Sequence, residues 1–438
     1  MLFQSMVPAV FKEMTTKTYG MANIERKKEA SKRLDFYHDD HLDYLEETLN
    51  QLFSDPSVML KAHLNIIRKI VTQLAMVYKT PPARTIEGSE QDQERFNEMI
   101  KQASLDVKLR QASRYVKLLK TILLRPVWRK GQMDLDILTP DILDVACGLS
   151  PEDIQEVLIT DYGTSQQIEE VEFSYWSAES WRRLDHAGNV IEEQPNPYKI
   201  LPFVPRFDYP PPGSEFWLTG GDDLVSLQEA INVKLVDLLH LLQMQSFGVG
   251  WIKGAQGGGT LKVDPGSLVE LPGEKEAAIG FESQKAEIGQ VVNAIDKLIK
   301  WAVVSQGLSA ASMSTDLSDR QSGEAKRIDK QELDEARLED VALWRKYERQ
   351  LFNIMRVVWN YHNSRSKISE QARLKIDFSD PKTPASPKEE AEADDLALAQ
   401  GVITPVDLVM RNNPDLKTRE EALEYLMKLK EETRTLES

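Results

Sequence analysis

Residues His38–His41 read HDDH and combine two imidazoles with two carboxylates. On a helix, His38 and His41 stand three positions apart and share a face, with Asp39 and Asp40 between them. Imidazole nitrogens and carboxylate oxygens are groups that hold zinc-type ions in proteins. A solvated helix face explains the same pattern. We favour that interpretation because no HExxH motif is present and the other histidines are scattered, at His63, His186, His240 and His362.

A second acidic motif, GGDD at Gly220–Asp223, contains the Gly-Asp-Asp sequence with which RNA-copying polymerases hold metal ions on a hairpin. In this chain the motif precedes a helical pattern. Asp222 suits the N-cap of that helix, because a short carboxylate accepts hydrogen bonds from the first free backbone N–H groups. We therefore favour a helix cap over a metal site.

Motifs for nucleotide or acyl chemistry are missing from the sequence. GAQGGGT at Gly254–Thr260 lacks the lysine that reaches the phosphates in a P-loop, and no G-x-S-x-G nucleophile motif occurs. The single cysteine, Cys147, excludes intrachain disulfides and cysteine-based zinc sites. The sequence predicts no enzyme, no metal and no cofactor.

The 438 residues include 54 Lys and Arg against 70 Asp and Glu, a formal net charge of −16. This balance opposes tight nonspecific binding to nucleic acid, which relies on wide cationic surfaces. The longest uncharged stretches, such as 238–252, are 15 residues long. A bilayer crossing needs about 18–20 apolar residues. The N-terminus also lacks a signal-peptide pattern. We expect neither a membrane protein nor a secreted one.

The first half of the chain changes from helical to β-type periodicity. Apolar residues from Leu60 to Tyr78 recur every three or four positions and predict a helix that ends before Pro81. The sequence KTPPAR followed by EGSEQDQE predicts an exposed break, and Ser104–Leu124 predicts a second helix. From Asp134 to Pro205 short β-type runs predict a β-rich insert, the clearest being Ile154–Thr160, Glu170–Trp176 and Trp181–Leu184.

The second half is dominated by long helical patterns. A stripe from Leu224 to Leu242 predicts a helix of about six turns, Phe247–Phe281 is glycine-rich and β-prone, and a second striped helix follows from Ile288. Glu324–Asn363 predicts a helix near 40 residues and Arg373–Phe378 a strand. The linker DPKTPASPKEEAEADD precedes a terminal unit in which VITPVDLV and TREEALEYLMKLKEE predict two helices.

The predicted fold is mainly α with a β-rich insert, an α+β class. Two amphipathic helices joined through a β unit, followed by a 40-residue helix, carry more apolar surface than one chain can cover. Assembly into an oligomer covers such surfaces, and a heterologous interface that closes gives a ring.

The order of these segments resembles the portal proteins of tailed double-stranded DNA bacteriophages, over roughly residues 25–378. The resemblance rests on the sequences NIIRKIVTQLAMVYKTPP (Asn65–Pro82), EFSYWSAESWRRLDHAGNVIEEQPNPYKILPFVP (Glu172–Pro205), GGDDLVSLQEAINVKLVDLLHLLQMQSF (Gly220–Phe247), KVDPGSLVELPGE (Lys262–Glu274), and Ser322, Gly323 and Ala325. Lys326 departs from the apolar residue that some relatives have after these small residues.

The resemblance implies an elongated portal-type subunit in a ring with a central channel. Its parts would be an N-terminal segment (1–24), a wing (25–219, β-rich at 134–205), stem helices (220–246 and 284–306), a clip (247–283), a tunnel loop (307–322), a long wing helix and strand (323–378), a linker (379–386) and a helical crown (387–438).

The resemblance also implies partners. The family usually assembles as about twelve subunits at one capsid vertex. Double-stranded DNA passes through the channel, and the large subunit of the terminase, the packaging motor, docks at the clip. Head-completion or tail adaptor proteins dock there later, and the major capsid protein surrounds the ring. The expected location is the portal vertex of the virion, after assembly in the host cytoplasm.

Charge suggests how DNA would slide. Residues 309–330 carry four acids and four bases, so the constriction is predicted to be near neutral and its phosphate contacts transient. The candidates for those contacts are Arg320, Lys326, Arg327 and Lys330, and salt bridges between subunits are the competing explanation. The candidates for motor docking are Trp251, Lys253, Lys262 and Glu270, against loop solvation or contacts with a neighbouring subunit.

Two other functions stay open from the sequence. A structural oligomer that handles no DNA, such as another virion connector or scaffold, would use the same long helices without a DNA-wide channel. A metal-dependent nucleic-acid enzyme would use HDDH or GGDD, and metal analysis with a nuclease or polymerase assay separates it from both.

Overall fold

A computed structural model describes residues 20–53, 59–162, 170–247, 249–253, 278–282, 288–310, 323–378, 387–413 and 418–436. The chain divides into two compact units, Met1–Ser379 and Asp380–Ser438. Each unit has its own apolar core.

Helices form most of the described chain. In the first unit they are α2 (Gly20–His38), α3 (Leu42–Leu52), α4 (Ile66–Leu74), α5 (Glu90–Gln102), α6 (Leu105–Leu119), α7 (Asp222–Phe247), α8 (Ile288–Val304) and α9 (Gly323–His362). The second unit contains α10 (Pro387–Ala399), α11 (Pro405–Asn412) and α12 (Arg419–Leu436). Helix α10 begins at Pro387, the first residue of the predicted crown, and its first residues belong to the sequence DPKTPASPKEEAEADD.

The described strands of the first unit form four antiparallel sheets. The larger two are a meander, β4 (Leu143–Cys147), β5 (Ile154–Asp161), β6 (Glu172–Ser177), β7 (Ser180–Leu184) and β8 (Val190–Pro195), and a three-stranded sheet in the order β3 (Gln132–Leu138), β2 (Thr121–Arg129), β9 (Val204–Phe207). The smaller two pair β1 (Ala83–Glu87) with β12 (Arg373–Asp377) and β10 (Val249–Lys253) with β11 (Ala278–Glu282). This arrangement confirms a fold of mixed helices and sheets.

One large apolar core runs through the first unit. Helix α9 packs against β2, β9 and β12, and its buried face includes Trp344, Phe352 and Trp359. Helices α4 and α6 pack against each other and contribute Ile67, Ile70 and Leu109 to the same core. In the second unit, Val406, Val409 and Ala422 join α11 to α12. The apolar stripes predicted from 3.6-residue periodicity therefore face these cores.

The predicted helix over Ser104–Leu124 is confirmed up to Leu119 and is wrong in its last five residues. Helix α6 ends at Leu119, because Lys120 takes a positive φ of 67°, and the chain then enters β2. Pro126 lies inside this strand, paired with Leu135 of β3. The pairing with β9 stops at Leu124, so the strand is an edge at Pro126 and the missing N–H interrupts no ladder on that side.

Two other expectations differ from the structure. The helix predicted from Leu60 to Tyr78 covers only Ile66–Leu74, and the residues just before it run irregularly to Asn65, whose side chain accepts a hydrogen bond from Arg68 N–H. The exposed break expected around KTPPAR contains β1, in which Ile86 is buried. Pairing with β12, far along the chain, creates this strand, and no local pattern reveals it.

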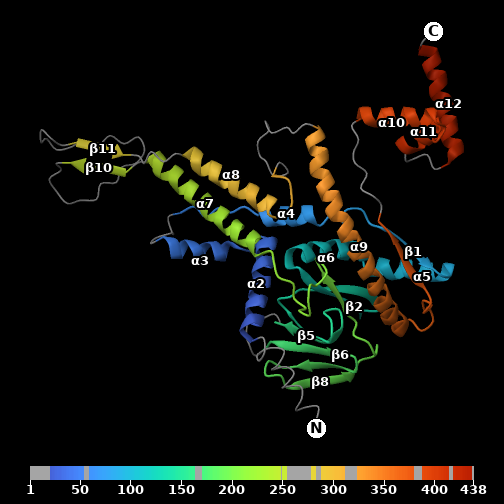
Figure 1. Cartoon of the computed structure of the whole chain (residues 1–438), viewed down its shortest axis with the longest axis horizontal. Helices are drawn as coiled ribbons and strands as arrows, with labels where there is room; N and C mark the ends of the chain where they lie inside the picture. Colours follow the sequence, from blue (N-terminus) through green and yellow to red (C-terminus); the bar gives the residue numbers. More distant parts are fainter. Residues whose placement is uncertain are drawn as a thin grey trace. The chain divides into compact units, whose positions relative to one another are not determined.

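Helices α7 and α8 lie side by side, and the antiparallel β10–β11 pair stands between them in the chain (Figure 1). Among the helices that the structure describes, none has the length and low charge that crossing a bilayer requires.

Candidate functional site

The GGDD motif forms the start of α7. Gly220 and Gly221 have φ values of 119° and 92°, in the left-handed region that favours glycine. Asp222 is the first helical residue, not a residue ahead of the helix, and it forms an ion pair with Arg33 of α2. Asp223 accepts a hydrogen bond from the Gln306 side-chain amide at 3.0 Å. The carboxylates of Asp222 and Asp223 thus hold the start of α7 to α2 and to the residues after α8. Among the described residues, neither belongs to a group of potential metal ligands.

Two buried amides hold α7 against the segment that leads into α4. The Gln228 side-chain oxygen accepts hydrogen bonds from the N–H groups of Ile66 and Ile67, at 2.8 and 3.3 Å. Its nitrogen donates to Leu64 C=O at 2.7 Å and to Asn232 Oδ1 at 3.0 Å. Asn232 Oδ1 also accepts from Leu64 N–H at 3.0 Å. We call this arrangement the amide clamp. It satisfies N–H groups at the start of α4 that have no partner within their own helix.

Helix α8 is apolar on two sides. Ile295, Ala302 and Val303 are buried, on the side that meets the rest of the unit. Trp301 and Val304 stand three positions apart, so their side chains are neighbours on the helix surface. They are 61% and 56% exposed. An exposed tryptophan beside an exposed valine on a long helix favours contact with another protein surface.

The residues expected to dock a motor fall around the β10–β11 pair. Trp251 and Lys253 are on β10, opposite Gly280 and Ala278 of β11. Lys262 and Glu270 lie outside the described residues. The described part therefore places two of the four candidates on one strand.

The residues expected to contact DNA fall around the start of α9. Lys326, Arg327 and Lys330 lie within the first eight residues of this helix, and Arg320 lies outside the described residues, as do 311–322 of the tunnel loop. The described candidates for motor docking and for DNA contact thus lie on different elements, β10 and α9.

The second half of α9 is anchored by buried charges. Glu348 is 3% exposed, and its carboxylate accepts hydrogen bonds from Arg84 at 2.7 and 3.2 Å and from the Tyr78 hydroxyl. Arg84 also donates to Asp106 at 2.6 Å. Burial on its own lowers the pKa of Arg84, but the hydrogen bonds to Glu348 and Asp106 outweigh it and raise that pKa. We call Tyr78, Arg84, Asp106 and Glu348 the charge anchor.

A buried arginine fills the space beside the charge anchor. The Arg206 guanidinium lies 3.4 Å from the ring centre of Trp344 and 4.2 Å from that of Tyr347. Its nitrogens have no hydrogen-bond partner among the described residues. Burial lowers the pKa of Arg206 to about 10. Aromatic faces thus provide the stabilisation of this cation that hydrogen bonds supply elsewhere.

Sequence reasoning missed the amide clamp and the charge anchor. Gln228 and Asn232 are one turn apart beside the apolar stripe of α7, and two amides at that spacing are the only local indication of a buried polar contact. Their partners lie more than 160 residues earlier in the chain. Glu348 and Arg84 are separated even further, so no local pattern joins them.

The family model described as "Phage portal protein, SPP1 Gp6-like" matches residues 55–435. No curated protein matches the chain.

The solved structures that match the chain include chains of gene transfer agent particles. The chain titled "Virion of native gene transfer agent (GTA) particle" is 12% identical, with 78% of this chain and 88% of that chain covered and a TM-score of 0.41. A chain of "Neck of empty GTA particle computed with C6 symmetry" is 14% identical, with 79% and 88% covered and a TM-score of 0.39.

Proposed function

The chain belongs to the SPP1 Gp6-like family of phage portal proteins, and from this premise we propose that it forms a ring-shaped channel at one capsid vertex, through which viral DNA is packaged and ejected. The family is structural rather than enzymatic. The single observation that carries the proposal is the match of the portal family over residues 55–435.

Ring formation is supported by the exposed side of α8. Trp301 and Val304 have their side chains largely in solvent in the single chain, and a neighbouring copy would remove them from water. In this arrangement α7 and α8 form the stem (220–246 and 284–306) and residues 247–283 the clip between them. Residues 25–219 and 323–378 form the wing, residues 307–322 the tunnel loop, and residues 387–438 the crown, after a linker at 379–386.

Native mass spectrometry with negative-stain electron microscopy tests the ring. The expected result is a closed ring of about twelve chains with a central hole wide enough for a DNA duplex. Trp301→Glu should shift the protein toward monomers, whereas Arg349→Glu, a charge change at an exposed position of α9, serves as the control. A wild-type protein that stays monomeric at all salt and protein concentrations would overturn the proposal. A ring with a hole too narrow for DNA would favour a connector or scaffold instead.

The start of α9 is proposed to face the passing DNA. Four acids and four bases in residues 309–330 make this region near neutral, so a duplex would slide without being held. Arg320, Lys326, Arg327 and Lys330 would supply transient contacts to phosphates.

A packaging assay tests these contacts. Replacing Arg320, Lys326 and Arg327 together with alanine should reduce packaged or retained DNA and leave the ring intact. Arg349→Ala, an exposed base farther along α9, is the control. Unchanged packaging by the triple variant removes these residues from the proposed site.

The β10–β11 pair and the segment between its strands are proposed to dock the terminase large subunit, and later the head-completion or tail adaptor proteins. Trp251, Lys253, Lys262 and Glu270 would make these contacts. In a binding assay with the purified motor subunit, alanine at all four positions should weaken binding to intact rings. Ile252→Ala is the control, and equal binding by the fourfold variant counts against the assignment.

The major capsid protein would surround the ring in the virion, at the portal vertex, after assembly in the host cytoplasm. Immunogold labelling of intact particles should then mark a single vertex.

A further inference from the structure

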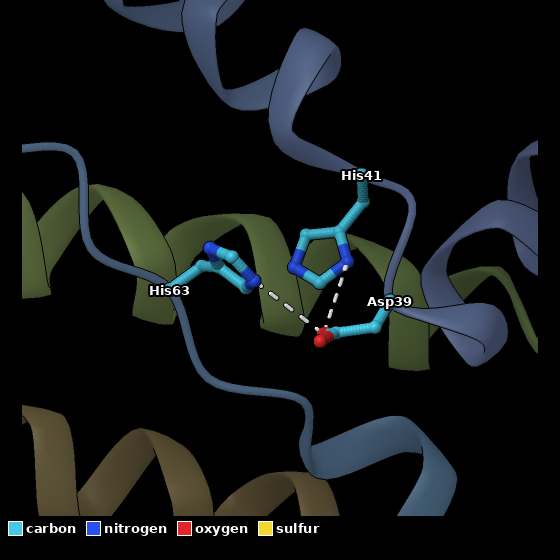
Figure 2. Close-up of side chains that lie close together, drawn as sticks. All are labelled: Asp39, His41 and His63. Carbon is cyan, nitrogen blue, oxygen red and sulfur yellow. Dashed lines mark ion pairs between the residues drawn. The ribbon is translucent and has the colours of Figure 1, made fainter.

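Three side chains that could bind a metal ion meet where α2, α3 and the segment before α4 come together. Asp39 follows the last residue of α2, His41 directly precedes α3, and His63 belongs to the irregular segment ahead of α4. Figure 2 shows both imidazole rings beside the carboxylate of Asp39. The structure corrects the expectation of a solvated helix face at HDDH, because α2 ends at His38 and His41 is buried outside the helix. His38 instead contacts the Tyr115 hydroxyl at 3.2 Å, and His63 takes its place in the group of potential ligands.

The distances within this group are close to those of a metal site. His63 Nε2 lies 3.4 Å and His41 Nδ1 4.0 Å from Asp39 Oδ1 (Figure 2). One ligand atom from each residue lies within 4.8 Å of the other two. Nitrogen and oxygen ligands sit about 2.0–2.2 Å from Zn²⁺, so in a tetrahedral site they are about 3.4 Å apart. One pair already has this spacing, and the others would need to approach by no more than about 1.4 Å.

His41 is the buried member of this group, and its ring nitrogens lack hydrogen bonds in the part of the chain that the structure describes. Its side chain is 1% exposed, yet neither ring nitrogen has a hydrogen-bond partner among the described residues. One face of its ring stacks on Phe36, with ring centres 4.5 Å apart, and the His63 ring meets it edge-on at 4.7 Å. Buried polar groups without a partner are rare, and an ion that binds there is one explanation for such a group.

The backbone around the group is fixed by other contacts. Asp39 has a positive φ of 73°, and Asp40 N–H donates to Asp35 C=O at 2.8 Å, which holds the turn after α2. The residue after His63 is held to α7 by the amide clamp, since Leu64 donates to Asn232 and accepts from Gln228. Asp39 and His63 are thus presented from two segments that are each held in place independently of the group.

We propose that Asp39, His41 and His63 form a binding site for one Zn²⁺ ion per chain. Two imidazoles and one carboxylate match the ligands that zinc takes, and magnesium and calcium prefer sites built only from oxygen. The Asp39 side chain is 51% exposed, so water can complete the coordination from that side. The bound ion would connect the α2–α3 turn to the segment that α7 clamps. Its role would be structural, and the proposal does not depend on DNA or on ring formation.

Zinc binding by the full-length protein tests this proposal. After chelator treatment and removal of the chelator, the wild-type protein should bind one Zn²⁺ per chain by isothermal titration calorimetry, with a rise in melting temperature. Asp39→Asn and His63→Gln should each weaken binding at least tenfold and abolish the thermal shift. Because both side chains are at least partly exposed, these variants should fold. Absence of a one-to-one site in the wild-type protein would overturn the proposal.

Two neighbouring substitutions serve as matched controls. Asp40→Asn and His38→Gln change the other two residues of HDDH, and both variants should bind zinc as the wild type does. With Co²⁺ in place of Zn²⁺, the wild-type protein and both controls should show the visible absorption of cobalt held by nitrogen and oxygen ligands. Equal loss of binding in the controls, or equal binding by Asp39→Asn and His63→Gln, would show that the ion binds elsewhere.

Discussion

Helices α7 and α9 are both long and both belong to the first unit, but they are held in different ways. Helix α9 is fixed by the charge anchor, with Glu348 and Arg84 almost fully removed from water. Helix α7 is fixed by the neutral amide clamp near its start, and its partner α8 keeps Trp301 and Val304 in solvent. A buried ion pair thus holds the helix that crosses the core. The buried polar contacts of α7 are neutral, and its ion pair with Arg33 uses the largely exposed carboxylate of Asp222.

The difference has an energetic reason. A buried charge without its partner is very unfavourable, so a charge network fixes α9 in one position but leaves little tolerance for change. Amide hydrogen bonds are weaker and do not depend on pH, so they hold α7 under a wider range of conditions. Four substitutions test this contrast, in order of decreasing effect on the stability of the chain.

The largest effect is expected for Glu348→Ala. The substitution leaves Arg84 buried with only Asp106 to compensate it, and removing one partner of a buried ion pair costs about 3–5 kcal/mol. Urea unfolding followed by circular dichroism should detect this loss. Arg349→Ala, at the exposed neighbouring position, should stay within about 0.5 kcal/mol of the wild type. A loss below about 1 kcal/mol for Glu348→Ala would mean that the charge anchor does not hold α9.

A smaller effect is expected for Gln228→Leu. Leucine keeps the volume but leaves the N–H groups of Ile66 and Ile67 and the carbonyl of Leu64 without their partner, at about 1–3 kcal/mol. Hydrogen exchange should show faster exchange at Ile66 and Ile67. Gln243→Leu, at an exposed position of α7, should leave these amides protected. Unchanged exchange in Gln228→Leu would contradict the amide clamp.

Acid should weaken a buried carboxylate contact that lies outside the charge anchor, and it should leave the amide clamp unaffected. Asp92, at the start of α5, accepts hydrogen bonds from Ser369 N–H at 3.0 Å and from the Ser89 hydroxyl at 2.9 Å. Burial on its own raises the pKa of Asp92, but these hydrogen bonds outweigh it and lower the pKa. Its contribution to stability is therefore complete above the unfolded value, about 3.9, and is lost as the pH falls through the folded value.

The Asp92→Asn variant tests whether the Asp92 contribution to stability is lost in acid. Its unfolding free energy should fall less steeply than that of the wild type between about pH 5 and pH 2. Glu94→Gln, an exposed change on the same helix, should follow the wild-type curve. Because the amide clamp contains no titrating group, Gln228→Leu should lower stability equally at every pH, and a steeper acid loss in that variant would argue against the contrast.

The smallest effect on the stability of a single chain is expected for Trp301→Ser. Its side chain is mostly in solvent, and such substitutions usually change stability by no more than about 0.5 kcal/mol. Melting curves at concentrations where the protein is monomeric should overlay those of the wild type. A large loss would place Trp301 in the fold of the chain and remove it from the proposed interface.

Local periodicity in the sequence was sufficient to predict α7, α8, α9 and most strands of the meander. Each of these has an apolar stripe or β-type run that packs against a neighbour close in the chain or against a large core. All of β1 and β2 were missed, because pairing with distant strands overrides the local preference of β1 and of the start of β2.

The chemistry of the candidate sites was harder to predict. HDDH drew attention to Asp39 and His41, but only the folded chain brings His63 to them, since the segment that carries it is placed by Gln228 and Asn232 of α7. Of the residues expected at DNA and the motor, the structure describes the strand or helix for Trp251, Lys253, Lys326, Arg327 and Lys330. Their roles stay predictions.

Strand β1 cannot pair until the ribosome has synthesised β12. The two strands are about 290 residues apart, and a ribosome adding about 5–20 residues per second needs roughly 15–60 s between them. During that interval the backbone hydrogen-bonding groups of β1 have no partner strand. An unpaired strand of this kind can pair with a strand of another nascent chain. Slower translation or lower temperature lengthens the interval, so the yield of correctly folded chain depends on the rate at which the message is read.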